Sequence, residues 1–149
     1  MYDNSEGISE NKAKALQWYK KAAEQGLADA QNKMGVKYFY SEDIERNHSK
    51  AIKWFKKAAA QGHPEAQFHL GEYYTNIEGS PIDYNKAIKW YRKSAEQGFY
   101  PAEFNLAALY YKGNSVKQDY KEAFELFQEA ANQGDPQAQF QLGVMYDNS

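Results

Sequence analysis

The 149-residue sequence has no cysteine, no excess of basic residues and no long apolar run. Without cysteine there is neither a disulfide framework nor thiolate chemistry, although the cellular compartment stays open. The 18 basic and 20 acidic residues argue against a general binder of nucleic acid or membrane surfaces, because binding to phosphate needs a clear basic excess. No stretch approaches the roughly 20 apolar residues of a membrane span, and residues 1–12 lack the basic-then-apolar order of a secretion signal.

Catalytic and metal-binding motifs are also missing. His48, His63 and His69 are the only candidates for acid–base or zinc chemistry, and the last two are six residues apart rather than the four that place two ligands on one helix face. There is no phosphate-binding glycine loop and no Gly-x-Ser-x-Gly motif. We therefore predict a non-enzymatic protein without catalytic residues, metal or cofactor.

A 36-residue repeat dominates what is present. A Gln-Gly pair recurs at 25–26, 61–62, 97–98 and 133–134, each time after nearly the same phrase (WYKKAAEQG, WFKKAAAQG, WYRKSAEQG, LFQEAANQG). A strict period of this length is typical of stacked repeat proteins. We predict one all-α domain over residues 1–149, with units of roughly 1–26, 27–62, 63–98 and 99–134 and a partial unit at 135–149.

The helix that ends at each Gln-Gly has an apolar arc of roughly 160°, wide enough to pack against neighbours on two sides. Its N-cap is predicted at Asn11, Asn47, Asp83 and Asp119, and Asp119 with Glu122 resembles a capping box. The glycine of each pair closes the helix in a left-handed conformation.

A second helix follows each glycine, with Pro64 and Pro136 near its start and Pro101 one position later. The final copy is predicted at about 136–147. Polar, irregular segments near 41–47, 76–83 and 112–119 are predicted loops. The recurring residues of this helix are Ala30, Met34, Gly35 and Tyr38, then Ala66, Leu70, Gly71 and Tyr74, then Ala102, Leu106, Ala107 and Tyr110.

These phrases resemble the Sel-one-like repeat (SLR), a relative of the tetratricopeptide repeat. The family pattern is Ala-x-x-x-Leu-Gly-x-x-Tyr, a Gly-x-Gly-Val loop, then Lys-Ala-x-x-Trp-Tyr-x-Lys-Ala-Ala-x-x-Gly. The segment 112–116 approaches the family loop, whereas residues 41–44 contain no glycine. The resemblance covers essentially the whole chain and implies a right-handed α/α superhelical solenoid, with the alanine–leucine–glycine helix on the concave side and the tryptophan-bearing helix on the convex side.

The resemblance also implies a scaffold or adaptor that binds a protein or peptide on its concave face. The alternatives are an immunity or inhibitor protein for one cognate effector, a hydrolase as suggested for some cysteine-rich relatives, and a self-assembling structural array. We expect a soluble bacterial protein, cytoplasmic or, if cut from a longer precursor, periplasmic or secreted. Nucleic acid and membrane insertion are not expected.

The candidate partner-binding residues lie on the first helix of each repeat, away from its Ala–Leu–Tyr stripe. They vary between repeats, and several are large aromatic residues where a solvated helix would carry polar groups. For the phenylalanines at 68, 104 and 140, packing between repeats is an equally weighted alternative. The predicted site comprises Phe39, Tyr40, Phe68, Glu72, Thr75, Phe104, Ala108, Tyr111, Lys112 and Phe140.

The two ends of the chain are related. Met1–Ser5 recurs as Met145–Ser149 at an offset of 144 residues, four periods. The helix predicted at 136–147 lacks a tryptophan-bearing mate, and the helix at about 12–25 lacks most of its own first helix. We predict head-to-tail self-association through these uncapped ends. The first three repeats carry a lysine stripe on the tryptophan-bearing helix, most simply a solvated face, and the fourth replaces it with Glu122, Gln128 and Glu129.

Overall fold

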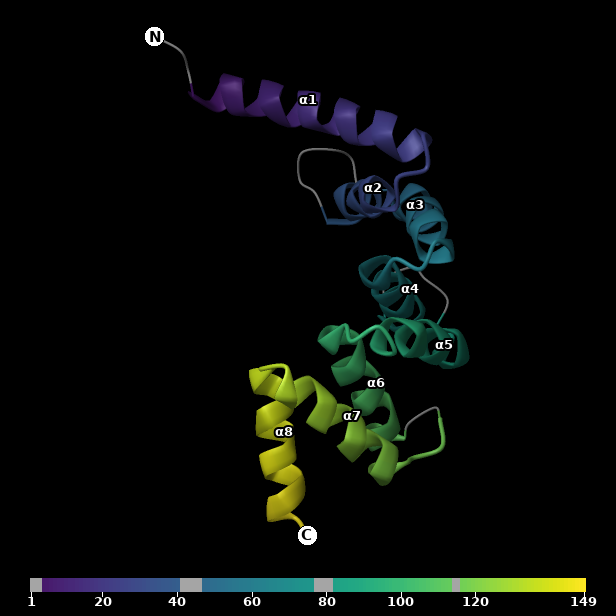
Figure 1. Ribbon diagram of the computed structural model, residues 1–149, viewed down its shortest axis with the longest axis vertical. Helices are drawn as coiled ribbons and strands as arrows, with labels where there is room; N and C mark the ends of the chain where they lie inside the picture. The colour runs from purple at the N-terminus through teal and green to yellow at the C-terminus, as the bar shows by residue number, and fades with distance from the viewer. Residues whose placement is uncertain (1–3, 41–46, 77–81, 114–115) are drawn as a thin grey trace. The chain divides into compact units, whose positions relative to one another are not determined.

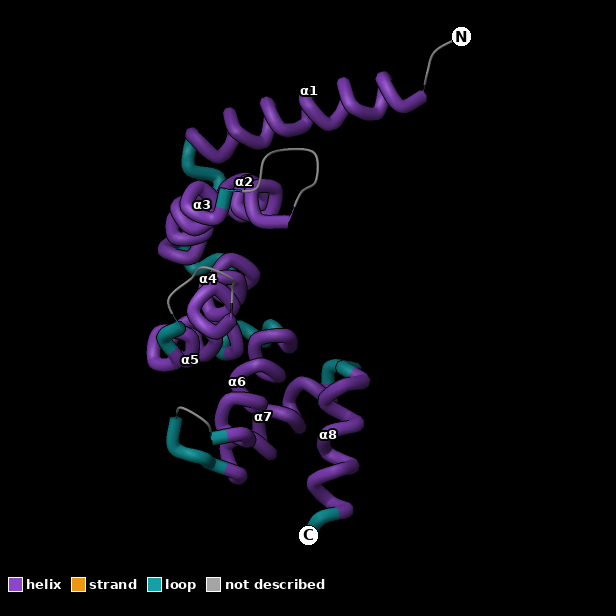
Figure 2. Tube along the Cα trace, turned by 180° about the vertical axis from the view of Figure 1, so that it is seen from behind, coloured by secondary structure: helices purple, strands orange, loops and turns teal. Residues whose placement is uncertain are grey.

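The computed structural model describes residues 4–40, 47–76, 82–113 and 116–149, and all the regular structure in these ranges is α-helical (Figure 1). Short turns and loops make the described connections between helices (Figure 2). The predicted all-α fold is confirmed. None of the described helices combines the length and apolar character needed to cross a membrane. The helices are α1 (Asn4–Glu24), α2 (Ala28–Tyr40), α3 (His48–Ala60), α4 (Pro64–Asn76), α5 (Tyr84–Ala95), α6 (Tyr100–Lys112), α7 (Tyr120–Asn132) and α8 (Pro136–Asp147).

The chain divides into two compact units, residues 1–66 (unit 1) and residues 67–149 (unit 2). Unit 1 contains α1 to α3 and the first residues of α4, and unit 2 contains the rest of α4 and α5 to α8. In unit 1 the buried side chains of Ala23, Ala30 and Met34 form a cluster against which Trp54 packs. In unit 2 the core is larger and includes Leu106 and Phe127.

Local sequence signals place the helix ends. Asn47, Asp83 and Asp119 each accept a hydrogen bond from the backbone N–H three residues later, at 2.9, 3.1 and 3.0 Å, which satisfies an otherwise unpaired amide at the helix start. The glycine of every Gln-Gly pair has a positive φ, between 79° and 96°, a conformation that costs glycine little. Pro64 and Pro136 are the first residues of their helices, and Pro101 is the second residue of α6. These predicted helix ends are confirmed.

Two capping predictions need correction. The prediction of an N-cap at Asn11 is wrong, because α1 begins at Asn4 and runs straight through this residue. At the later caps, the backbone N–H of Asn47 or Asp119 also donates to a tyrosine carbonyl of the preceding helix, whereas Tyr2, at the matching position before Asn11, lies outside the described residues. The capping box is also incomplete: the N–H of Asp119 donates to the Tyr110 carbonyl, and the Glu122 carboxylate accepts from Arg92.

Aromatic rings of one helix pack against glycine in the helix before it. A Cβ added to Gly35 would lie 2.5 Å from the Phe55 ring, and one added to Gly71 would meet the Tyr91 ring in the same way. Both rings are 2% exposed or less. Glycine is therefore needed at these positions because a side chain would overlap the ring.

The glutamine of the Gln-Gly pair joins consecutive repeats through its side chain. The amide of Gln61 donates to Gln31 at 2.8 Å, and that of Gln97 donates to Gln67 at 2.9 Å. In the next repeat Gln133 donates at 2.8 Å to a carboxylate, that of Glu103. In the recurring Gln-Gly pair, the glycine thus ends the helix, and the glutamine makes a polar contact with a side chain 30 residues earlier in the chain.

Candidate interaction surfaces

Two of the predicted partner-binding rings pack inside unit 2. The Phe68 ring lies 5.8 Å from that of Tyr91 and 5.4 Å from that of Phe99, and the Phe104 ring lies 5.5 Å from that of Phe127. Both are partly buried against the unit 2 core. For these two residues the structure supports packing between repeats. Phe140, at the same position in α8, is 74% exposed.

Three further predicted residues, Glu72, Thr75 and Ala108, are partly buried in unit 2. The Thr75 hydroxyl donates to the Glu72 carbonyl at 2.9 Å and lies 3.5 Å from the Tyr91 hydroxyl. Burial raises the pKa of Tyr91 to about 12, against the opposing effect of its hydrogen bonds with Thr75 and Asn105. Thr75 therefore helps to satisfy a buried hydroxyl, a structural role.

In unit 1 the end of α2 carries a small aromatic surface. The Phe39 ring stacks on the His48 imidazole at 4.8 Å and meets the Tyr40 ring edge-to-face at 4.6 Å. Phe39 is partly buried and Tyr40 is exposed. Both predicted residues therefore belong to one aromatic cluster, of which Tyr40 is the accessible part.

A pocket of about 470 Å³ opens in unit 2 at the C-terminal ends of α6 and α8 and the start of α7. Its volume falls within the range of small-ligand pockets. Tyr111 is the predicted site residue that lines it, and Lys112 is the exposed last residue of α6 beside it. We call this the tyrosine pocket; it is lined by Tyr111, Tyr120, Met145, Asn148 and Ser149.

Gln118 links the two tyrosine residues of the tyrosine pocket. Its side-chain amide donates to the Tyr111 carbonyl at 2.9 Å and to the Tyr120 hydroxyl at 2.7 Å, and the two rings meet edge-to-face at 5.5 Å. Gln118 can approach because Gly113 ends α6 with φ 62°, and a Cβ there would lie 2.5 Å from the Gln118 Cβ. These hydrogen bonds of Gln118 preorganise the Tyr120 side of the pocket wall.

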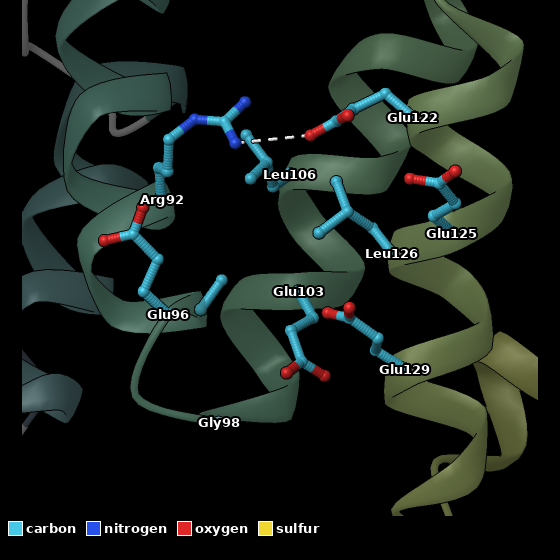
Figure 3. A pocket seen from close by; sticks show the side chains of 10 residues that line it. Arg92, Glu96, Gly98, Glu103, Leu106, Glu122, Glu125, Leu126 and Glu129 are labelled. Carbon is cyan, nitrogen blue, oxygen red and sulfur yellow. Dashed lines mark hydrogen bonds and ion pairs between the residues drawn. The ribbon is translucent and has the colours of Figure 1, made fainter.

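A second hollow, of about 440 Å³, lies between α5, α6 and α7 (Figure 3). Arg92 extends from α5 towards Glu122 on α7, while Glu96, which follows the last residue of α5, and glutamates of α6 and α7 line the remainder (Figure 3). We call this the glutamate groove. Its charged residues are Arg92, Glu96, Glu103, Glu122, Glu125 and Glu129.

Arg92 compensates for the loss of a lysine in the fourth repeat. Lys50 and Lys86 each lie over the tyrosine ring of the preceding helix, at 5.4 and 5.3 Å. The corresponding residue in α7 is Glu122, and Arg92 instead bonds the Tyr110 hydroxyl at 2.7 Å and the Glu122 carboxylate at 3.2 Å.

Glu103 is the buried member of the glutamate groove. Burial, and then the nearby charge of Glu129, raise its pKa above the ordinary value of 4.5, while the hydrogen bond from Gln133 opposes this shift. The groove thus concentrates negative charge around one carboxylate that binds a proton more tightly than an exposed glutamate.

The glutamate groove was not predicted from the sequence, and neither was the participation of Tyr120 and Met145 in the tyrosine pocket. The exchange of lysine for glutamate in the fourth repeat was a usable signal for the groove. Within the described ranges, no group of three or more histidine, cysteine, aspartate or glutamate residues is arranged to hold a metal ion. The histidines have structural partners: His48 stacks on Phe39, His63 contacts Asp29 at 2.9 Å, and His69 contacts Glu72 at 3.1 Å.

Comparison with known families identifies the repeat. The profile of the Sel1 repeat matches residues 1–27, 28–63, 64–99, 101–135 and 136–149. The chain belongs to the Sel1 repeat family. Proteins of this family are generally scaffolds for protein interactions. No curated protein matches this Sel1 repeat chain at a significant level.

Solved Sel1 repeat structures have the same fold. A protective antigen of uropathogenic Escherichia coli, c5321, aligns over 91% of this chain with a TM-score of 0.86 and 34% identity, and a Sel1 repeat protein from Oxalobacter formigenes aligns over 89% with 0.83 and 37%. The chain spans 29% and 54% of the lengths of these two proteins. Helicobacter pylori cysteine-rich protein B, at 24% identity, covers 88% of this chain and matches over 94% of its own length with a TM-score of 0.68. The solenoid architecture is thus that of the family.

Proposed function

We propose that this Sel1 repeat chain is a non-enzymatic scaffold that binds a segment of a partner protein through the tyrosine pocket. The observation that carries the proposal is a preformed pocket walled by two tyrosine rings that meet edge-to-face, with the Tyr120 hydroxyl hydrogen-bonded to Gln118. Aromatic side chains in rigid, accessible positions are the residues that contribute most to protein interfaces. The role of the family as interaction scaffolds supports the same class of function.

The chemistry of the pocket indicates the kind of segment that it accepts. The Tyr111 and Tyr120 rings and the Met145 side chain offer apolar surface, and methionine adapts to rings of different shape. The Tyr120 hydroxyl accepts a hydrogen bond from Gln118, so its own hydrogen is available to a carbonyl group. We therefore expect a peptide that inserts one aromatic or branched aliphatic side chain and places a backbone carbonyl near Tyr120.

Peptide display against the 149-residue protein tests this proposal. Enriched peptides should share a large apolar residue, and their affinity, measured by fluorescence polarisation, should fall at least tenfold in Tyr120→Ala and in Tyr111→Ala. Tyr120 is exposed, so its removal should leave the fold intact, as circular dichroism would verify.

Two control variants locate the site. Tyr40→Ala removes an exposed tyrosine of unit 1, and Glu125→Gln with Glu129→Gln neutralises part of the glutamate groove. Both should bind the enriched peptides as the unchanged protein does. Peptides that are rich in lysine and arginine and bind only while the glutamates are intact would move the site to the groove. Failure to enrich any peptide would refute the proposal.

A further inference from the structure

We propose that copies of this chain associate head to tail, with α1 of one copy packing on α7 and α8 of the next. The contact would reproduce the packing that already joins α2 to α3 in unit 1. It is independent of the tyrosine pocket, which lies between the ends of α6 and α8 and the start of α7.

One half of the contact is an unfilled site on α8. Gly143 occupies the position of Gly35 and Gly71, against which the rings of Phe55 and Tyr91 pack. Apart from its chain neighbours and the backbone of its own helix, however, no described atom comes within 4 Å of a Cβ built at Gly143. Phe140, three residues earlier, is 74% exposed. We call Phe140 and Gly143 the α8 socket. The α8 socket has the same glycine as the sites at Gly35 and Gly71, but no described aromatic ring packs against it.

The counterparts of Phe140 show which ring belongs there. Phe68 and Phe104 each pack against the aromatic residue 23 positions later, Tyr91 and Phe127. Tyr91 also packs on Gly71 of the preceding helix, as Phe55 packs on Gly35. A ring at the same position of a following tryptophan-bearing helix would therefore contact both Phe140 and Gly143.

The other half of the contact is a ring on α1. Tyr19 lies at the position of Phe55, Tyr91 and Phe127, offset by multiples of 36 residues. Those three rings are at most 2% exposed, whereas Tyr19 is 36% exposed. Unit 1 thus presents the ring that the α8 socket lacks, on the kind of helix that carries it in the other repeats.

Trp18 provides a second, independent match. Trp54, one period later, packs against Ala23, Ala30 and Met34, whereas Trp18 is 68% exposed. The residues at the corresponding positions of the last repeat, 108 further along, are Ala131, Ala138 and Leu142. Met34 is fully buried, but Leu142 is only partly buried. Seating Trp18 of a second copy over Leu142 would complete this cluster as Trp54 completes that of unit 1.

Sequence spacing and charge favour a second copy as the occupant. If a second copy continued the repeat, its Tyr19 would stand four periods, or 144 residues, further on. It would then follow Gly143 at the same separation at which Phe55 follows Gly35. Residues 145–149 also repeat residues 1–5 at this spacing of 144 residues. Residues 1–66 carry 11 basic and 9 acidic residues, whereas residues 67–149 carry 7 basic and 11 acidic residues. Opposite net charges on the two partners' surfaces favour their encounter.

The geometry of such a contact predicts open chains. The two surfaces differ, so each copy that binds leaves a free socket at one end and a free α1 at the other. Association must also offset the loss of translational and rotational freedom, so the mean assembly size should rise with protein concentration.

Sedimentation velocity and light scattering over roughly three decades of concentration, up to about 1 mM, test the proposal. The unchanged protein should grow beyond dimers. Gly143→Leu adds a side chain to the socket at a point where a Cβ meets no other described element of its own chain, and it should weaken association at least tenfold, as should Trp18→Ala with Tyr19→Ala. Tyr100→Ala removes an exposed ring of α6, a helix that takes no part in the proposed contact, and should associate normally.

A mixing experiment separates this arrangement from any symmetric one. The Gly143→Leu protein keeps a working α1, and the Trp18→Ala, Tyr19→Ala protein keeps a working socket. Each should be monomeric alone at concentrations where the unchanged protein assembles, and a mixture should give a one-to-one dimer that grows no further. Circular dichroism verifies that both variants are folded. A monomeric unchanged protein at every concentration, or a mixture that stays monomeric, would overturn the proposal.

Discussion

The α1–α3 region of unit 1 and the α5–α7 region of unit 2 occupy equivalent places in the repeat, but the last helices of the two regions, α3 and α7, differ in the sign of their exposed charges. Four exposed positions are Lys20, Lys50, Lys53 and Lys57 in unit 1. The same positions in unit 2, 72 residues later, are Arg92, Glu122, Glu125 and Glu129. The first of these four positions is basic in both units, whereas the other three, on α3 and α7, change from lysine to glutamate.

The inner positions of the same regions hardly change. Phe55 and Tyr91 both pack on glycine, and Asn47 and Asp119 cap their helices through the same hydrogen bond. The repeat thus preserves close packing in its interior, where a small change in side-chain volume is costly. Charge on the solvent-facing side is free to vary, because exposed charges contribute little to stability. The charged surface is thus where such a chain can acquire partner specificity.

The largest expected effect comes from filling the shared glycine sites. Gly35→Leu in unit 1 and Gly71→Leu in unit 2 place a side chain where the Phe55 or Tyr91 ring lies. Each should lower the free energy of unfolding by about 2–3 kcal/mol, measured by urea denaturation. Gly143→Leu, measured in dilute protein, should leave stability unchanged or raise it by up to about 1 kcal/mol, since it only removes a glycine from a helix. Similar losses at all three sites would show that the packing argument is wrong.

A smaller effect is expected where unit 1 departs from unit 2 in its interior. Asn32 lies where unit 2 has Phe68 and Phe104, and it is buried with a side-chain oxygen that has no hydrogen-bond partner among the described residues. Asn32→Leu should raise the free energy of unfolding by about 1–2 kcal/mol, because it removes the cost of an unpaired buried acceptor. Asn105 in unit 2 donates to the Tyr91 hydroxyl, so Asn105→Leu should instead be destabilising. A gain in both variants would contradict the explanation.

The smallest effect tests the buried carboxylate. The pKa of Glu103 is raised by folding, so the folded protein binds this proton more tightly than the unfolded chain, and stability falls as pH rises above about 4.5. Glu103→Gln keeps an acceptor for Gln133 and should be slightly more stable than the unchanged protein at pH 7, with the difference vanishing near pH 4.

The reciprocal change in unit 1 sharpens this test. Gln31→Glu introduces a carboxylate at the equivalent position, in a region whose outer residues are lysines rather than glutamates. At pH 7, Gln31→Glu should lower the free energy of unfolding by less than Glu103→Gln raises it, because unit 1 has no glutamate at the position that corresponds to Glu129. Urea denaturation of both variants at pH 7 and pH 4 would measure the difference, and equal and opposite changes would show that the surrounding charge has no influence.

Helix ends were predictable because their signals are local. Asp83 and Asp119 cap a helix within three residues, and Gly62 ends one within a single turn. Asn11 has the same local signal and failed, because the later caps are also held by a tyrosine carbonyl of the preceding helix. A cap residue alone thus does not fix where a helix begins.

The candidate sites were only partly predictable. Tyr111 and Tyr40 were identified as exposed aromatic residues of the first helices, but Phe68 and Phe104 share their character and pack between repeats. The same residue type at the same helical position is buried or accessible according to whether a following helix covers it, as Phe140 shows. The periodicity of the sequence shows which face of a helix is apolar, but it does not show whether a neighbouring helix covers that face.

By itself, the sequence determined the repeat period, the helical hairpins and most of their ends, because these follow from interactions within a few residues and from one apolar face per helix. The tertiary structure was needed to show that Gln118 links Tyr111 and Tyr120, that glutamates of α6, α7 and the end of α5 line one groove, and that no described ring packs on Gly143. Each of these depends on side chains from different helices meeting in space, and that meeting is set by packing rather than by position along the chain.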